Sequence, residues 1–495
     1  MDKASNKSYS DILKATTLFG GVKVFGILIS MARSKVIALL IGAEGMGITS
    51  LFLSTINLFQ VFTNFGLDKS GVKEIAHAAE NLGENQLLEK SNLLMKLVRG
   101  TALLGGVSML ALSPFLSKIA FGDYSYTLSF VWLSISLLFL HVTNGRLAVL
   151  QGLRRHKELA KANVVGNFLA LVFTVPLYYF FGIDAIVPAI ILATFITLIV
   201  TYRYSVGNYF KTAKVSFVKA YLAGSGMVRL GMVLSISAIL TMLSSYLLQV
   251  FISFQDGTEF VGFYNAGYII LNSYLGLIFN AMATDYFPRL SSVAGQIEKA
   301  SLLVFQQAHI ALLLVTPIIV FFIAFAPFII KVLYSGEFNP TIDFLKWGIL
   351  GMFFKATSFC IGYLIIAKGD SKLFVRTVVS FNILLLSMNL GSYYFFGLEG
   401  LGISLFVYFF IHFVTLSIIT YYRYGFYLPR SFYKAQFLGI IFCGGAFAVT
   451  FLENELYKYG LLILLLICSM TVSILQLHKK TNLLQFVKEF FNKRK

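Results

Sequence analysis

Tyr178-Tyr179-Phe180-Phe181-Gly182 is followed, 215 residues later, by the same five residues at Tyr393-Tyr394-Phe395-Phe396-Gly397. The same offset relates the only two tryptophans, Trp132 and Trp347. Further pairs at this offset are Glu44 and Glu259, Gly47 and Gly262, Lys157 and Lys372, Lys161 and Arg376, and Asn167 and Asn382. These matches keep the same order along the chain. They therefore predict two homologous halves followed by an unrepeated C-terminal tail.

The composition of the chain is that of a membrane protein. Of its 495 residues, 58% are hydrophobic and 13% are charged, and the mean hydropathy is +0.80. Long uncharged runs indicate helices, because a helix satisfies its backbone polar groups within each membrane span. The short alternating segments of a membrane β-barrel are absent from the sequence. Three cysteines, Cys360, Cys443 and Cys468, lie in apolar runs and are interpreted as packing residues.

About fourteen runs are long and apolar enough to be spans, each near the ~20 residues needed to cross a bilayer. Twelve of them fall in the two halves, six in each. The predicted spans are 12–41, 45–66, 93–116, 126–149, 162–181 and 185–202; then 226–252, 263–285, 302–328, 346–367, 377–396 and 402–421; and finally 435–452 and 459–477.

This arrangement predicts an all-α polytopic fold with two pseudo-symmetric six-helix lobes. The lobes are assigned to residues 1–222 and 223–434, and residues 435–495 supply two extra spans and a basic amphipathic tail. Because six is an even number, both halves begin on the same side of the membrane. They are therefore parallel repeats related by an axis along the membrane normal.

The positions of the basic residues predict the orientation. With both termini placed inside, the inside segments hold 27 of the 40 lysines and arginines and the outside segments hold three. Cytoplasmic loops carry such an excess, so an N-in and C-in topology is expected. This distribution accounts for most of the net charge of +18 without a nucleic-acid partner. The inside surface should attract anionic membrane lipids.

The motifs of several enzyme classes are missing from the sequence. There is no Gly-Lys dipeptide for a P-loop, no Asp-x-Asp, and no histidine pair at metal-ligand spacing. The predicted outside loops are also too short for a membrane glycosyltransferase or polymerase site. We therefore expect no enzyme activity, no cofactor and no metal.

Cations within the predicted spans are the candidates for function. Lys23 and Lys355 lie deep in their spans, where an unpaired charge costs about 3 kcal/mol or more unless it faces a cavity or a partner. A role in a substrate pathway and a purely structural hydrogen-bonding role are both compatible with this position. Arg33 lies ten residues after Lys23, about 15 Å along a helix and within about 80° of the same face.

Three further cations complete the candidate set. Lys35 points nearly opposite Arg33 on a regular helix, while Arg146 and Arg229 lie nearer the inside ends of their spans, where snorkelling is the simpler interpretation. The predicted substrate-binding residues are Lys23, Arg33, Lys35, Arg146, Arg229 and Lys355. A cavity lined by these cations between two repeats suits a bulky anion.

Several stretches together resemble one family of exporters. They are Gly42–Gly47, Tyr286–Ser291, Gly362–Lys368 after Lys355, and the lysine of the first span. Taken in order, these stretches are similar to the O-antigen and enterobacterial-common-antigen (Wzx-type) flippases of the multidrug/oligosaccharidyl-lipid/polysaccharide exporter superfamily. The resemblance covers about residues 10–425, and residues 435–477 exceed the common twelve-span pattern.

The resemblance implies a function and partners. The substrate would be an oligosaccharide on undecaprenyl pyrophosphate, moved across the bacterial inner membrane by alternating access during polysaccharide or lipopolysaccharide biosynthesis. Polysaccharide polymerase and chain-length machinery are further expected partners. Two alternatives remain open: a multidrug or other lipid-linked precursor exporter of the same superfamily, and a polymerase or ligase of the same pathway.

Overall fold

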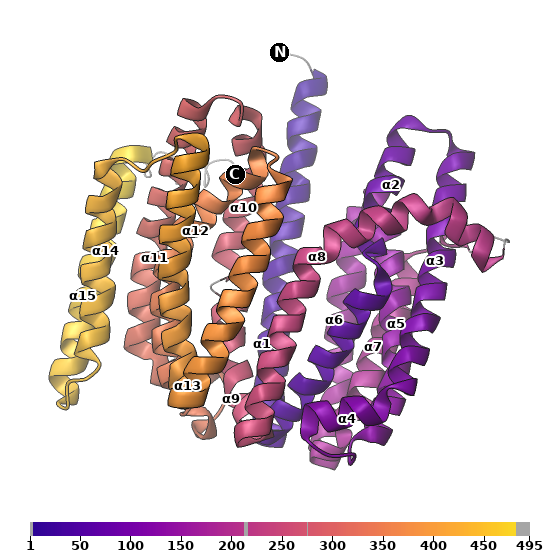
Figure 1. Ribbon diagram of the computed structural model, residues 1–495, viewed down its shortest axis with the longest axis horizontal. Coiled ribbons are helices and arrows are strands. Elements are labelled where there is room, and N and C mark those ends of the chain that lie inside the picture. The colour runs from indigo at the N-terminus through magenta and orange to yellow at the C-terminus, as the bar shows by residue number, and fades with distance from the viewer. Residues whose placement is uncertain (1–2, 212–215, 275, 482–495) are drawn as a thin grey trace. The chain divides into compact units, whose positions relative to one another are not determined.

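The computed structural model describes residues 3–211, 216–274 and 276–481, and in its first helix it describes side chains from Phe25 onward. The described residues form helices joined by short turns (Figure 1), and no strand occurs among them. Two compact units can be distinguished, Met1–Asn265 and Ala266–Lys495. The chain is thus all-α, as its composition predicts.

Ten helices among the described residues are long and apolar enough to cross a membrane. Three of these ten are bent at a glycine, Gly42, Gly182 or Gly397, and each covers two predicted spans. The predicted span 263–285 falls instead on two shorter helices and the π-helical turn between them. The protein is therefore a multi-pass membrane protein, while its N-in and C-in orientation stays a prediction.

The first unit begins with the long helix α1 and continues with shorter helices that pack on one another. Its elements are α1 (Lys3–Asn64), α2 (Leu67–Asn81), α3 (Glu84–Ala111), α4 (Ser113–Phe121), α5 (Thr127–Gly152), α6 (His156–Phe181), α7 (Ile186–Tyr204) and α8 (Phe217–Asp256), with 3-10 turns at Gly182–Ala185 and Asn208–Phe210. α9 (Thr258–Ile269) crosses the boundary between the units.

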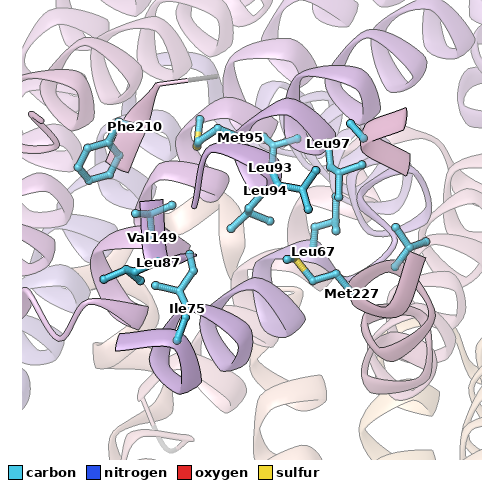
Figure 2. Packing of buried hydrophobic residues seen from close by; sticks show 14 of the residues in the cluster. Leu67, Ile75, Leu87, Leu93, Leu94, Met95, Leu97, Val149, Phe210 and Met227 are labelled. Carbon is cyan, nitrogen blue, oxygen red and sulfur yellow. The ribbon is translucent and has the colours of Figure 1, made fainter. Parts of the chain in front are cut away.

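A cluster of buried aliphatic side chains holds one end of this unit together. Figure 2 shows Leu67 and Ile75 of α2 beside Leu94 of α3 and Val149 of α5, with Met227 of α8 at the edge of the cluster. Burial of a leucine- or methionine-sized side chain contributes about 1.5–3 kcal/mol. The cluster therefore anchors the short helix α2 against three longer helices.

The second unit contains the remaining helices. They are α10 (Gly276–Val293), α11 (Ile297–Leu333), α12 (Thr341–Ala367), α13 (Ser371–Tyr424), α14 (Arg430–Val449) and α15 (Glu455–Thr481). α12 packs against both α11 and α13, and α11 also contacts α14 and α15, the yellow pair in Figure 1. The two helices without a counterpart in the repeat thus pack on α11. The predicted basic amphipathic tail lies outside the described residues from position 482 onward.

The repeated aromatic motif has the same structure in both halves. Gly182 (φ 55°, ψ −131°) and Gly397 (φ 57°, ψ −141°) adopt nearly the same backbone conformation, which favours glycine because a Cβ atom would be strained there. Tyr178 and Tyr393 are buried, whereas the other aromatic residues of both motifs are exposed. Exposed aromatic rings near the end of a span are typical of a membrane–water interface.

The turns between spans one and two and between spans seven and eight also match. Gly42 (φ 66°, ψ −169°) and Gly257 (φ 90°, ψ 178°) are separated by the repeat offset. Both have a positive φ, which turns the chain from one helical segment into the next. Just beyond them, Gly47 lies against the Thr258 carbonyl group, and Gly262 lies against the carbonyl group of Ala43. Ala43 and Thr258 are also equivalent by the offset. Each repeat therefore places the same glycine against the same carbonyl group of the other repeat.

The division by packing differs from the division by repeat. Sequence assigns the lobes to 1–222 and 223–434, whereas α8 and the start of α9 pack with the first unit, up to Asn265. Contacts such as the Ser50–Gln249 hydrogen bond (2.8 Å) bind α8 to α1 and explain this difference. The lobe boundaries are a statement about sequence homology and stay a prediction.

Candidate functional site

Lys355 lies near the middle of α12 and is held among aromatic rings. Its Nζ atom is 5.6 Å from the ring centroid of Phe279 in α10 and 5.1 Å from that of Phe409 in α13. A ring face attracts a cation by roughly 0.5–2 kcal/mol, depending on how far the pair is shielded from water. The ion pairs among the described residues do not include Lys355. Among the described residues, its charge is thus stabilised by aromatic faces and not by a carboxylate.

His412 of α13 adds a polar group beside this lysine. The imidazole is close enough to Lys355 for an electrostatic interaction. It packs against the rings of Phe381 (centroids 4.2 Å apart) and Tyr408 (5.7 Å). Its Nδ1 atom has no hydrogen-bond partner among the described residues, although it is shielded from solvent. A ligand polar group could satisfy this atom, because an unpaired buried polar atom is costly.

Arg33 of α1 is a candidate binding residue of the first unit. It is half-buried and interacts electrostatically with Tyr178, the buried tyrosine of the repeated motif on α6. The ion pairs among the described residues do not include Arg33. The first residue of the repeated aromatic motif therefore has a second role, as a neighbour of a candidate binding residue.

Arg146 of α5 has a different environment. Its guanidinium group donates from Nε to the Ser205 hydroxyl group (2.6 Å) and from Nη2 to the Ser205 carbonyl oxygen (2.5 Å). The Cζ atom of the group lies 3.7 Å from the Tyr202 ring centroid and 4.9 Å from that of Phe210. Arg146 is fully buried and holds the end of α7, so we leave it out of the proposed binding set.

Comparison with known proteins identifies the family. A family model described as "Polysaccharide biosynthesis protein" matches residues 36–343, which is more than half of the chain. The chain belongs to this polysaccharide biosynthesis family. The curated protein sequences contain no significant match to it.

Solved structures show that this polysaccharide biosynthesis protein has the fold of exporter-superfamily transporters. A structure described as the lipid II flippase MurJ in an inward closed conformation matches with a TM-score of 0.70 and 14% identity, over 94% of this chain and 99% of that one. An inward-facing multidrug resistance MATE family transporter of the MOP superfamily matches with a TM-score of 0.63 and 15% identity, over 79% and 94%. A MOP superfamily transporter from Pyrococcus furiosus, described by a reverse polarity of its binding pocket, gives 0.57 and 15%, over 82% and 95%.

These findings confirm the resemblance read from the sequence at the level of family and fold. The substrate stays a prediction, because identities near 15% establish the fold alone. The remaining candidate residues of this family member are placed as follows. Lys35 and Arg229 are exposed on α1 and α8. Lys23 lies on α1 before the bend at Gly42, but its side chain is outside the described residues.

The candidate residues whose side chains are described have different surroundings. Within the first unit, Arg33 adjoins Tyr178, whereas Arg146 is bound to the end of α7. Lys355 belongs to the second unit, where it interacts with Phe279, Phe409 and His412. Sequence analysis missed Phe279, Phe409 and the pairing of His412 with Lys355. The sequence repeat could have indicated this pair. The positions equivalent to Lys355 and His412 in the first half are Leu140 and Thr197, so the lysine and the histidine occur in the second half alone.

Proposed function

We propose that this protein is a flippase for a lipid-linked oligosaccharide. The observation that carries the proposal is Lys355, a cation in the middle of a membrane-spanning helix, surrounded by aromatic rings and a histidine and without an ion-pair partner among the described residues. A charged group in such a place is by default a functional residue. Membership of a polysaccharide biosynthesis family and the fold shared with a lipid II flippase support this substrate class.

More specifically, we propose that the substrate is an undecaprenyl-pyrophosphate-linked repeat unit. Lys355, Arg33 and Lys23 would bind the pyrophosphate, since phosphate oxygens are strong acceptors for lysine and arginine. Arg229 and Lys35, both exposed, remain candidates for an initial encounter. The isoprenoid chain would stay in the lipid phase while the hydroxyl groups cross in a polar pathway, because burying them unpaired costs several kcal/mol.

Alternating access between the two repeats would carry the headgroup across. Two negative charges moving outward through the membrane gain about 4.6 kcal/mol per 100 mV of inside-negative potential. In this proposal the membrane potential favours the loaded step from the inner to the outer leaflet. The predicted orientation, with its basic inside surface, matches a substrate made at the inner leaflet.

Two other functions predict different chemistry. A multidrug exporter for cationic drugs would need acidic residues deep in its spans, whereas the deep candidates here are basic. A polymerase or ligase would need catalytic residues on an outside loop, and the predicted outside loops are short. Neither alternative explains a membrane-embedded lysine that packs against aromatic rings and has no ion pair among the described residues.

The test uses cells in which this gene is replaced by variants. We expect Lys355→Gln to reduce surface glycan and to cause lipid-linked glycan to accumulate on the inner leaflet. Lys346→Gln is the matched control, because Lys346 lies on the same helix and already pairs with Asp343 (3.2 Å). A glycan-cleaving enzyme is added to sealed spheroplasts to locate the lipid-linked glycan. The enzyme cannot cross the membrane, so it cleaves only molecules in the outer leaflet.

The outcomes separate the hypotheses. Accumulation protected from the added enzyme in Lys355→Gln cells, but not in control cells, supports flipping. Accumulation that is accessible from outside would instead indicate a later step, such as polymerisation. Normal surface glycan in Lys355→Gln cells would reject Lys355 as a binding residue.

A further inference from the structure

A groove of about 760 Å³ runs along α3 and α8 within the first unit. Its floor is formed by Leu67, Leu97 and Val228, which belong to the buried cluster shown in Figure 2. A rigid floor of this kind fixes the shape of the groove, because the cluster packs α2, α3 and α8 together. The volume falls within the range of pockets that hold a small organic ligand.

The walls of the groove are exposed apolar side chains. α3 contributes Leu103, Leu104 and Val107, and α8 contributes Phe217 and Tyr221, all more than 40% exposed. On a helix that crosses a membrane such residues face lipid. The groove is therefore a depression into which an acyl chain can enter from the bilayer without passing a polar barrier.

Two cations, Lys96 and Arg99, lie at one end of the same groove. They are three residues apart on α3, so they are neighbours on the helix surface. The ion pairs among the described residues include neither of them. Arg99 also lies close enough to Arg146 for charge repulsion between the two guanidinium groups. None of the described residues that line the groove is acidic, so this end is electropositive and suited to an anion.

The spacing along α3 matches one leaflet of a bilayer. From Lys96 to Val107 there are eleven residues, or about 16 Å of helix. Half of a hydrocarbon core of about 30 Å is about 15 Å. A headgroup at Lys96 would thus sit at the interface while its chain reached the bilayer centre at Val107. On the predicted orientation this is the cytoplasmic leaflet.

We propose that this groove binds an anionic phospholipid, with its phosphate group at Lys96 and Arg99 and one acyl chain between α3 and α8. Basic pockets between membrane helices bind lipid headgroups in this way. None of the residues that line the groove belongs to the proposed substrate residues. The lipid site and the flippase proposal can therefore fail independently.

The test is native mass spectrometry of the full-length protein in detergent, with dioleoyl phosphatidylglycerol and dioleoyl phosphatidylcholine added at equal concentration. We expect the wild type to retain phosphatidylglycerol preferentially. Each cation near a lipid headgroup contributes about fivefold in affinity, so Lys96→Gln/Arg99→Gln should reduce that preference about 25-fold. Leu104→Trp should fill the groove and reduce retention of both lipids. Because Leu104 is half-exposed, this change does not enter the core.

The control variant is Lys157→Gln/Lys161→Gln. It removes two exposed cations of α6, on the same predicted side but outside the groove. An equal loss of preference in this variant would show a diffuse surface charge effect and overturn the site. Unchanged lipid retention in Leu104→Trp would also overturn it. The proposal would also be overturned if soluble glycerol phosphate displaced phosphatidylglycerol as effectively as the intact phospholipid does, because the site would then bind phosphate without an acyl chain.

Discussion

The hairpin between α5 and α6 in the first repeat and the hairpin between α12 and α13 in the second can be compared bond by bond. All of these hydrogen bonds run from a backbone N–H group to a backbone carbonyl oxygen. In the first hairpin they join Arg154 to Gln151, Arg155 to Leu150 and His156 to Arg154. In the second they join Gly369 to Ile366, Asp370 to Ile365 and Ser371 to Gly369. Every pair of partners is related by the same offset of 215 residues. The central residue has positive φ in both, 55° at Arg154 and 70° at Gly369.

The interiors of the two repeats do not agree in this way. Lys355 and His412 interact electrostatically in the second repeat, and the equivalent positions in the first repeat are Leu140 and Thr197. Conversely, Arg146 of the first repeat is buried, and its equivalent in the second is the buried Ile361. The comparison shows that the repeats share their backbone turns and close helix contacts, whereas charged side chains in the interior are specific to one repeat.

The largest effect is expected at the glycine contact that both repeats make. A Cβ atom on Gly47 would lie 1.7 Å from the Thr258 carbonyl oxygen, and one on Gly262 would lie 2.0 Å from that of Ala43. Because backbone atoms must move in either case, Gly47→Ala and Gly262→Ala should each cost about 3 kcal/mol. Thermal unfolding of the purified variants in detergent measures this loss.

Gly226→Ala is the control for that experiment. Gly226 lies in α8, and among the described residues no heavy atom outside its own turn of helix comes within 4 Å of the position that an alanine methyl group would take. Alanine should therefore be neutral or slightly stabilising there, because it favours a helix more than glycine does. If only one of the two contact glycines proved sensitive, the equivalence of the two contacts would be broken.

Arg146 should give the next largest effect, and only in the first repeat. Arg146→Met keeps an apolar stem but removes two hydrogen bonds to Ser205 and the stacking on Tyr202. A hydrogen bond to a charged group contributes about 1.5–3 kcal/mol, so we expect a loss of about 2 kcal/mol in unfolding free energy. Arg229→Gln, at an exposed arginine, should stay within about 0.5 kcal/mol of the wild type. If Arg146→Met lowered the unfolding free energy no more than Arg229→Gln does, the buried contacts of Arg146 would add no stability.

His412 tests the asymmetry of the interiors directly. His412→Phe keeps the ring packed between Phe381 and Tyr408 but removes both nitrogen atoms beside Lys355. Loss of one neutral hydrogen bond to a ligand is worth about 1 kcal/mol, or about fivefold. We expect glycan translocation to fall by that factor while thermal stability is kept. A variant with full transport would show that His412 only packs, as an ordinary aromatic residue would.

A smaller effect is expected from the central residue of the two hairpins. A non-glycine residue in the left-handed region is strained by about 1–2 kcal/mol. Gly369→Ala should therefore cost about 1 kcal/mol. Arg154→Gly relieves the same strain but removes the exposed ion pair with Glu80 and adds freedom to the unfolded chain, so its net change should be within about 0.5 kcal/mol of zero. Thermal melting of both variants checks this difference, and equal costs would contradict it.

Much of the fold could be predicted from the sequence, because it depends on local patterns. Apolar runs gave the spans, and the repeat of residues 178–182 indicated the duplication and the glycine that ends each motif. Side-chain neighbours could not be predicted in the same way. Phe279 and Phe409 meet Lys355 only because of how α10, α12 and α13 are rotated about their axes. Apolar residues predominate around α12, so its sequence carries no strong periodic signal for the direction in which Lys355 points.

Arg146 shows a second limit of sequence analysis. Its position near the end of a span favoured a side chain that extends to water. The structure instead closes Ser205, Tyr202 and Phe210 around it, and all three come from the end of α7 or the turn beyond it. Such a partner set depends on where another helix ends, and helix ends are the least certain part of a prediction from sequence.

The smallest expected effect concerns Asp370, the N-cap residue before α13, at a position where the first repeat has Arg155. The Leu373 backbone N–H group (3.2 Å) and the Arg423 side chain (3.0 Å) both donate to its carboxylate and hold its pKa below the usual value. A carboxyl group with a lower pKa in the folded state stabilises the fold above its unfolded pKa of about 3.9 and loses that contribution as pH falls through the folded value. Asp370→Asn should therefore melt slightly below the wild type at pH 7, and the difference should shrink as pH falls below about 4 and vanish below the folded pKa of Asp370. A difference that stayed constant over this range would show that the charge of Asp370 does not matter and that the hydrogen bond to Leu373, which asparagine can also accept, holds the turn in place.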